Sequence, residues 1–184
     1  MGQPKPEAWN NPSRWLSVAI PPEIWHGTND PGGGRTMSST YLSLYYHLVF
    51  STKGREPNIA ATWRAKLHGY LRGIIEGLGG QCEIVGGIDD HVHLLVRLSA
   101  THRLADFMRE LKKASSTWVH EDMAERGFAW QEGYAAFTVS ASVVDEVRRY
   151  VENQEDHHRG RSFREELVIM LQRSGVKFDE RYLE

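Results

Sequence analysis

The sequence predicts an α+β fold: a ferredoxin-like antiparallel sheet of β-α-β-β-α-β order, with helices on one face and C-terminal helices that carry a tyrosine. Three observations predict it. Segments with strand and helix periodicity alternate in that order, the strand at residues 91–98 has a continuous apolar row on one side, and helical periodicity returns after residue 142. The composition, 40% hydrophobic and 25% charged, is ordinary for a globular protein, and 184 residues suffice for one well-buried domain.

The first 36 residues differ from the remainder. They are rich in Pro, Gly and Asn and carry no sustained period, which is typical of loop or disorder. Two explanations are open: a flexible extension, or a start assigned upstream in error, with Met37 as the true initiator. We favour the second, so the predicted catalytic domain is residues 37–184.

The first half of the domain alternates strand and helix. A strand is expected at residues 41–51, which are aromatic and rich in β-forming residues. Apolar residues then recur at helical spacing over residues 59–78, and "GLGG" ends this helix. A short strand at 81–88 and a turn at Asp89-Asp90 lead into the strand at 91–98.

The second half completes the pattern. An amphipathic helix is expected at residues 104–118, followed by one or two strands within 128–140. In the strand at 91–98, one row of side chains is wholly apolar: Val92, Leu94, Val96 and Leu98. We expect this row to face the helices and the opposite side of the strand, with its histidines, to lie on the open face of the sheet.

Two further helices are expected after the sheet. Ser142, with Asp145 three residues later, resembles a capping box that opens a helix running to about residue 157. A last helix is expected at residues 162–172.

Two sets of residues suggest chemistry. His91 and His93 point to the same face, because side chains alternate along a strand, and could give a divalent ion two nitrogen ligands. Tyr150 and Gln154 lie one helical turn apart; the glutamine could add an oxygen ligand, and the phenol beside such an ion could attack a phosphodiester. The ordinary alternative is a core tyrosine with a glutamine at the rim. The histidines at 157–158 follow this helix and could extend the metal site, but a solvated helix end is the stronger expectation.

The sequence resembles the single-tyrosine HUH transposases of small insertion sequences, which include the REP-associated tyrosine transposases. The histidine-apolar-histidine motif stands as His91-Val92-His93, and the family's tyrosine motif stands as "YVENQ", Tyr150 to Gln154. Similarity extends to "YHLVFSTKGREP" and "WQEGYAAFTVSAS", in the family's order, over about residues 40–170.

The resemblance implies a transposase that cleaves and rejoins single-stranded DNA at hairpin-marked element ends through a covalent 5′-phosphotyrosine intermediate. It implies Mg²⁺ or Mn²⁺ held by His91, His93 and Gln154, with Tyr150 as the nucleophile. It also implies a homodimer in which the tyrosine helix of one subunit acts in trans on the histidine pair of the other.

Four basic residues are the expected DNA phosphate contacts: Lys53, Arg55, Lys112 and Lys113. Ordinary surface cations are an equally good interpretation, and the net charge of −2 argues against indiscriminate nucleic-acid binding.

Two alternative functions stay open, and one further class of enzyme is excluded. A host-domesticated HUH nuclease that processes repeated palindromes would share the chemistry, and a non-catalytic nucleic-acid-binding ferredoxin-like domain would leave the histidines and Tyr150 without a role. A metal-hydrolase barrel is excluded because that fold needs about 250 residues. The single cysteine, Cys82, excludes a disulfide framework. With no apolar run that could span a bilayer and no signal peptide, a cytoplasmic location is expected.

Overall fold

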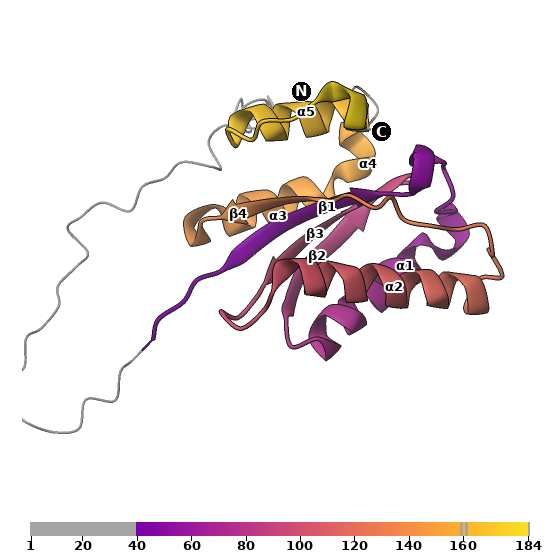
Figure 1. The fold of residues 1–184 in the computed structure, drawn as a ribbon, viewed down its shortest axis with the longest axis horizontal. Coiled ribbons are helices and arrows are strands. Elements are labelled where there is room, and N and C mark those ends of the chain that lie inside the picture. The colour runs from indigo at the N-terminus through magenta and orange to yellow at the C-terminus, as the bar shows by residue number, and fades with distance from the viewer. Residues whose placement is uncertain (1–39, 159, 161, 184) are drawn as a thin grey trace, which may run out of the picture.

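One antiparallel sheet organises the chain. The computed structural model describes residues 40–158, 160 and 162–183, so the predictions for residues 1–36 and for Met37 lie outside the described residues. Within this part the strands follow the order β2-β3-β1-β4 across the sheet (Figure 1). Their bounds are Tyr45–Ser51 for β1, Gln81–Gly87 for β2, His91–Arg97 for β3 and Ala135–Val139 for β4.

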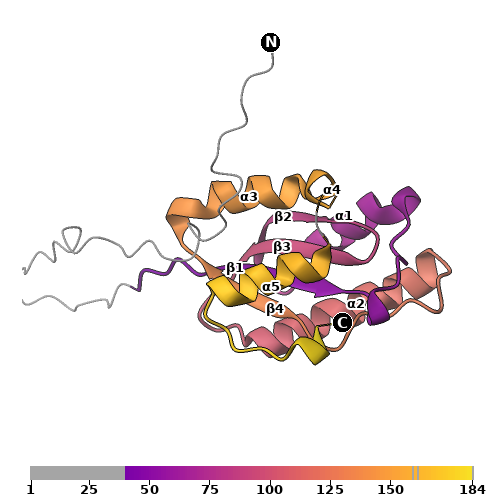
Figure 2. The same ribbon diagram turned by 90° about the horizontal axis from the view of Figure 1, so that it is seen from above.

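Two groups of helices enclose the sheet. Helices α1 and α2 lie against one face and α3, α4 and α5 against the other (Figures 1 and 2). The bounds are Ala61–Gly77 for α1, Leu104–Asp122 for α2, Val144–Glu152 for α3, Gln154–His157 for α4 and Phe163–Arg173 for α5. The β-α-β-β-α-β order and the α+β class are confirmed. In the described ranges, no helix combines the length and apolar character that crossing a bilayer requires.

The face toward α1 and α2 is the main core. Side chains of both helices pack there against alternate residues of the two central strands. These strand residues are apolar and fully or almost fully buried: Leu48, Phe50, Val92, Leu94 and Val96. The prediction that the apolar row of the strand at 91–98 meets the helices is therefore confirmed.

The opposite face is covered, and the expectation that the histidines lie on an open face was wrong. His91 and His93 are both 0% exposed. Two apolar clusters hold the C-terminal helices on this face. One joins Leu95 to α3 and the other joins Val49 to α5. Burial of a large apolar side chain stabilises by about 1.5–3 kcal/mol, so these contacts favour the packing of the C-terminal helices on this face.

Close approach of α3 to the sheet depends on a glycine. A Cβ atom built at Gly86 of β2 would overlap the carbonyl oxygen of Val151, one residue after Tyr150. Glycine at this position therefore lets the last turn of α3 pack directly on the strand backbone.

The C-terminal helices differ from expectation in their ends. The Ser142–Asp145 capping box is absent: α3 begins at Val144 after a short 3-10 turn, with no side-chain cap. Its C-terminal cap, Asn153, has φ −99° and ψ 25°, which separates α3 from α4 within the expected single helix. A capping box instead begins α5, at Ser162.

Candidate functional site

The two histidines of β3 are fixed by neighbours on the sheet. In the antiparallel register, His91 pairs with Ser51 and His93 with Val49, so both imidazoles point toward the C-terminal helices. His91 Nδ1 lies 2.6 Å from the Asp90 carboxylate. His93 Nδ1 lies 2.9 Å from His47 Nε2 on β1. Such partners orient an imidazole so that its other nitrogen can bind an ion.

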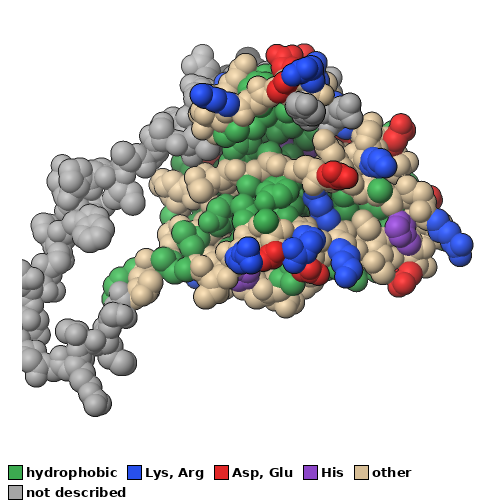
Figure 3. Space-filling model, viewed as in Figure 1, with side chains coloured by type: hydrophobic (Ala, Val, Ile, Leu, Met, Phe, Trp, Pro, Cys, Tyr) green, Lys and Arg blue, Asp and Glu red, His purple; other side chains and the backbone are tan. Residues whose placement is uncertain are grey.

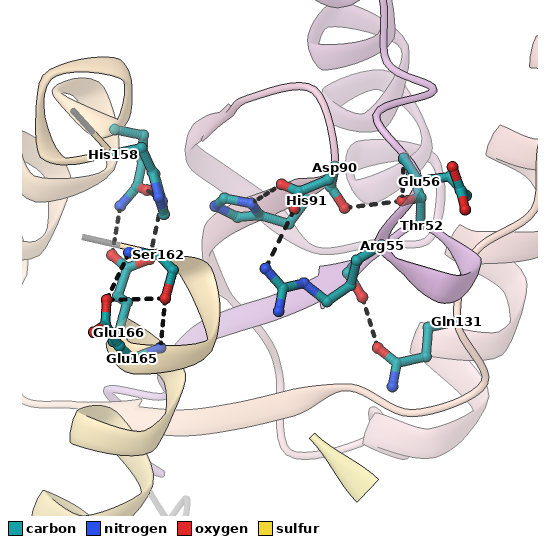
Figure 4. Close-up of polar contacts among 12 residues, drawn as sticks. Thr52, Arg55, Glu56, Asp90, His91, Gln131, His158, Ser162, Glu165 and Glu166 are labelled. Atoms are coloured by element: carbon teal, nitrogen blue, oxygen red, sulfur yellow. Dashed lines mark hydrogen bonds and ion pairs between the residues drawn. The ribbon is translucent and has the colours of Figure 1, made fainter. Parts of the chain in front are cut away.

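Two residues of the C-terminal segment join the histidine pair. Potential ligand atoms of His91, His93, His158 and Glu166 all lie within 4.8 Å of one another. Glu166 Oε2 lies 3.7 Å from His93 Nε2 and 3.1 Å from His158 Nε2. His158 and Glu166 lie on one side of His91, and Asp90 and Arg55 on the other (Figure 4). The expectation of a solvated helix end at 157–158 was wrong for His158, whose side chain is 9% exposed; the side chain of His157 lies outside those described.

The start of α5 explains this arrangement. Ser162 Oγ accepts from the Glu165 amide, and the Glu165 carboxylate accepts from the Ser162 amide at 2.9 Å, a complete capping box. The first residue of the helix, Phe163, stacks on the His91 ring with centroids 4.2 Å apart. The cap and the stack fix the first turn over the histidines, and Glu166 follows within that turn.

Burial decides the electrostatics of the site. Burial, assisted by the nearby Asp90 carboxylate, raises the pKa of Glu166 to about 8. Burial also opposes ionisation of Asp90, but its hydrogen bond to His91 and the neighbouring positive charges hold the pKa of that carboxyl below its usual value. Burial lowers the pKa of His47 to about 4, so this imidazole is neutral at pH 7. The site can therefore hold a carboxylate ion only where a positive charge accompanies it.

Tyr150 and Gln154 both reach the histidines. The Tyr150 ring, half-buried on α3, has its centroid 5.8 Å from that of His93 and 5.9 Å from that of His47. Gln154 is 1% exposed at the start of α4; its Nε2 donates to Glu166 at 3.2 Å and its Oε1 contacts His158 Nε2 at 3.0 Å. The structure brings the tyrosine, the glutamine and the histidine pair together within one chain.

The four basic residues fall into two groups. Arg55 lies 3.7 Å from the Asp90 carboxylate and over the Phe163 ring at 5.2 Å, at the edge of the site, with exposed Lys53 on the same short turn. Lys112 and Lys113 belong to α2, beyond the sheet from the histidines. Along α2, basic and acidic side chains lie next to each other on the surface (Figure 3). The structure therefore brings only the first group to the histidines.

Sequence reasoning missed three residues of this site. His47 carries a signal, because alternation along β1 places it on the same face as the histidine opposite it. Asp90 precedes the histidine motif directly, which also could have been used. Glu166 carries no signal, because only the packing of α5 on the sheet makes this helical glutamate a neighbour of the pair.

Comparison of the sequence with known proteins places similar proteins among transposases. The family model of IS200-like transposases matches residues 40–154. The ISDra2 transposase TnpA of Deinococcus radiodurans is 29% identical over 119 residues, covering 61% of this chain and 85% of that protein. The transposase for insertion sequence element IS200 of Salmonella typhimurium is 24% identical over 129 residues, covering 67% of this chain and 84% of its own.

A solved structure supports the fold. A protein of Deinococcus radiodurans R1 assigned as a transposase superposes with a TM-score of 0.52 and 28% identity, covering 67% of this chain and 97% of that one. The family match spans the four strands, the histidine pair, Tyr150 and Gln154, and includes well over half of the chain. The chain belongs to the family of IS200-like transposases.

Proposed function

We propose that this transposase cuts and rejoins single-stranded DNA at hairpin-marked ends of its element through a covalent 5′-phosphotyrosine on Tyr150. One observation carries the proposal: the Tyr150 ring lies 5.8 Å from that of His93, so nucleophile and candidate ion ligands share one site.

The bonds that form and break follow from this placement. The Tyr150 oxygen forms a bond to phosphorus and releases its proton to solvent, while the bond from phosphorus to the 3′ oxygen breaks. That oxygen takes up a proton and leaves as a free 3′-OH. Rejoining is the reverse attack of a 3′-OH on the phosphotyrosine. The number of phosphoester bonds is unchanged, so no nucleotide cofactor is needed.

The donor atoms fit a divalent ion. His91 Nε2 is buried and has no hydrogen-bond partner in the described part of the chain. Its lone pair is therefore available to bind an ion. Mg²⁺ or Mn²⁺ would be held by His91 and His93, with the Gln154 amide oxygen as the third ligand that the family resemblance implies. Bound there, the ion would polarise a phosphate oxygen. Asp90 keeps His91 in the orientation that this role requires.

The experiment is covalent capture. Full-length protein is incubated with hairpin-bearing single-stranded DNA and Mg²⁺ or Mn²⁺, and adducts are resolved on a denaturing gel. We expect an adduct with the wild-type protein and none with Tyr150→Phe, which should still shift the hairpin in a native gel. Tyr70→Phe is the matched control, because Tyr70 lies on α1, stacked on Trp118 beyond the sheet.

Two outcomes would contradict the proposal. An adduct that persists in Tyr150→Phe would assign the linkage to another residue. Hairpin binding by the wild-type protein with no adduct in either metal would favour a non-catalytic DNA-binding domain.

Assembly, DNA contacts and location stay predictions. The resemblance implies a homodimer with its tyrosine helix in trans. The position of Tyr150 beside His93 of the same chain supports attack within one subunit instead, and we propose this second arrangement. Lys53 and Arg55 are the better candidates for phosphate contacts because they lie at the edge of the site. Contacts through Lys112 and Lys113, and a cytoplasmic location, are likewise untested expectations.

A further inference from the structure

We infer that His158 and Glu166 bind the cation together with His91 and His93. The C-terminal segment is then part of the metal centre, and its donor set selects a transition metal ion over Mg²⁺. The inference deepens the proposed function, on which its catalytic meaning rests, but the ion site itself can be tested without DNA.

The distances suit one ion. Ligand atoms bound at about 2.1 Å can lie at most about 4.2 Å apart, on opposite sides of the ion. Glu166 Oε2 is 3.7 Å from His93 Nε2 and 3.1 Å from His158 Nε2, within this limit. The largest separation in the cluster is below 4.8 Å, so a shift of about half an ångström would bring all four atoms into range.

Burial points to a missing positive charge. The side chains of Glu166 and His158 are 8% and 9% exposed, and the two histidines of β3 are fully buried. In the described residues, the ion-pair partners of Glu166 are imidazoles and include no lysine or arginine. A buried carboxylate is costly without a partner of opposite charge. A divalent ion at the centre of the cluster would supply that charge and also satisfy His91 Nε2.

Each candidate ligand is also held in place by a second group, as is usual around protein metal sites. These contacts are Asp90 to His91, His47 to His93, and Gln154 to both His158 and Glu166. Gln154 thus contacts two members of the cluster through the two ends of its amide. In this arrangement Gln154 positions His158 and Glu166, in place of the ligand role that the family resemblance implies.

The donor chemistry sets the ion. Mg²⁺ prefers oxygen ligands in octahedral geometry, whereas imidazole nitrogens favour ions such as Zn²⁺, Co²⁺ and Ni²⁺. Three imidazoles and one carboxylate therefore favour a transition metal ion, and they leave room in the coordination sphere for a phosphate oxygen.

Cobalt binding tests the ligand set. Metal-free full-length protein is titrated with Co²⁺ and followed by its visible absorption, without DNA. We expect one Co²⁺ per chain, and at least about tenfold weaker binding for Glu166→Gln and for His158→Gln. Glu121→Gln, an exposed carboxylate on α2, is the control and should bind as the wild type does. Wild-type affinity in both Glu166→Gln and His158→Gln would overturn the inference.

A second variant guards against misfolding. Glu166→Cys replaces the carboxylate by a thiol on a shorter side chain, and a thiolate bound to Co²⁺ adds an intense near-ultraviolet charge-transfer band. We expect that band in Glu166→Cys and not in the wild-type protein, whose cysteine, Cys82, lies on β2 outside the cluster. A folded Glu166→Cys protein that lacks the band and still binds Co²⁺ as tightly as the wild type would exclude ligation by residue 166.

Competition with Mg²⁺ tests the ion preference. An excess of Mg²⁺ should leave the Co²⁺ spectrum unchanged, and displacement at equal concentrations would refute the selectivity. Failure of the proposed function would look different, since a protein that forms no DNA adduct could still show the full Co²⁺ results. Conversely, wild-type Co²⁺ affinity in both ligand variants, with a DNA adduct still formed, would leave strand cleavage standing and remove only this inference.

Discussion

At the scale of single residues, the contacts of a side chain in the structure separate lysines that look alike in the sequence. Lys112 is an instance. Its ammonium donates to the carbonyl oxygens of Gln131 at 2.9 Å and Glu132 at 3.2 Å and to that of Gly133, and it lies 5.1 Å from the Phe50 ring centroid. Burial lowers its pKa to about 8. Lys113, the next residue on α2, is exposed. Two adjacent lysines that are equivalent in the sequence therefore differ in their contacts and burial.

Lys112→Met should lower the free energy of unfolding by about 1–2 kcal/mol, because three carbonyl oxygens lose a charged donor. Lys113→Met should change it by less than about 0.5 kcal/mol, as is usual for exposed positions. Urea unfolding measures both, and gel shifts with a hairpin measure binding. Hairpin binding that weakens in Lys112→Met with stability unchanged would return this lysine to the DNA interface.

At the scale of elements, the strands and helices of the main layer could be predicted because their signals are local. The alternation in β3 and the helical period of α1 need no knowledge of the rest of the fold. The ends of α3 could not be predicted, because Ser142 makes no cap in the structure and Asn153 interrupts the helix. Burial of the histidine face also depends on long-range packing, which a single sequence does not contain.

Gly86→Ala should displace α3, since a methyl group would overlap the Val151 carbonyl oxygen. We expect a loss of about 1–3 kcal/mol in the free energy of unfolding, typical of overpacking, and less covalent adduct because Tyr150 moves with the helix. Gly73→Ala on the exposed side of α1 is the control. It should stabilise by about 0.5–1 kcal/mol through helix propensity. Equal effects of the two changes on stability and adduct would refute this account of α3.

At the scale of the whole molecule, the sheet separates the main hydrophobic core from the layer that contains the histidine cluster. Helices α1 and α2 form the main core with one face of the sheet, and α3 to α5 cover the other face (Figure 2). His91 and His93 are buried on that second face. The sequence was sufficient to predict His91, His93, Tyr150 and Gln154 as neighbours, because two motifs carry them. His158 could be offered only as an alternative and Glu166 not at all, since their position relative to the histidine pair depends on how the C-terminal segment packs.

Mixing two inactive variants tests whether one chain holds a complete site. Tyr150→Phe lacks the nucleophile, and a double variant, His91→Ala with His93→Ala, lacks the imidazoles. Tyr150 lies beside His93 of its own chain, so we expect the mixture to form no more adduct than either variant alone. Clear recovery of adduct in the mixture would instead establish exchange of the tyrosine helix between subunits. Pull-down of one variant through an affinity tag on the other checks that mixed dimers have formed.

The family match ends at residue 154, while the cluster draws two of its four members from the segment that follows. Sequence identity over the shared core therefore does not tell which metal ion should be added to an assay. Two relatives could align equally well up to the glutamine and still need different metals on the bench, and the residues after it are the ones to inspect before choosing.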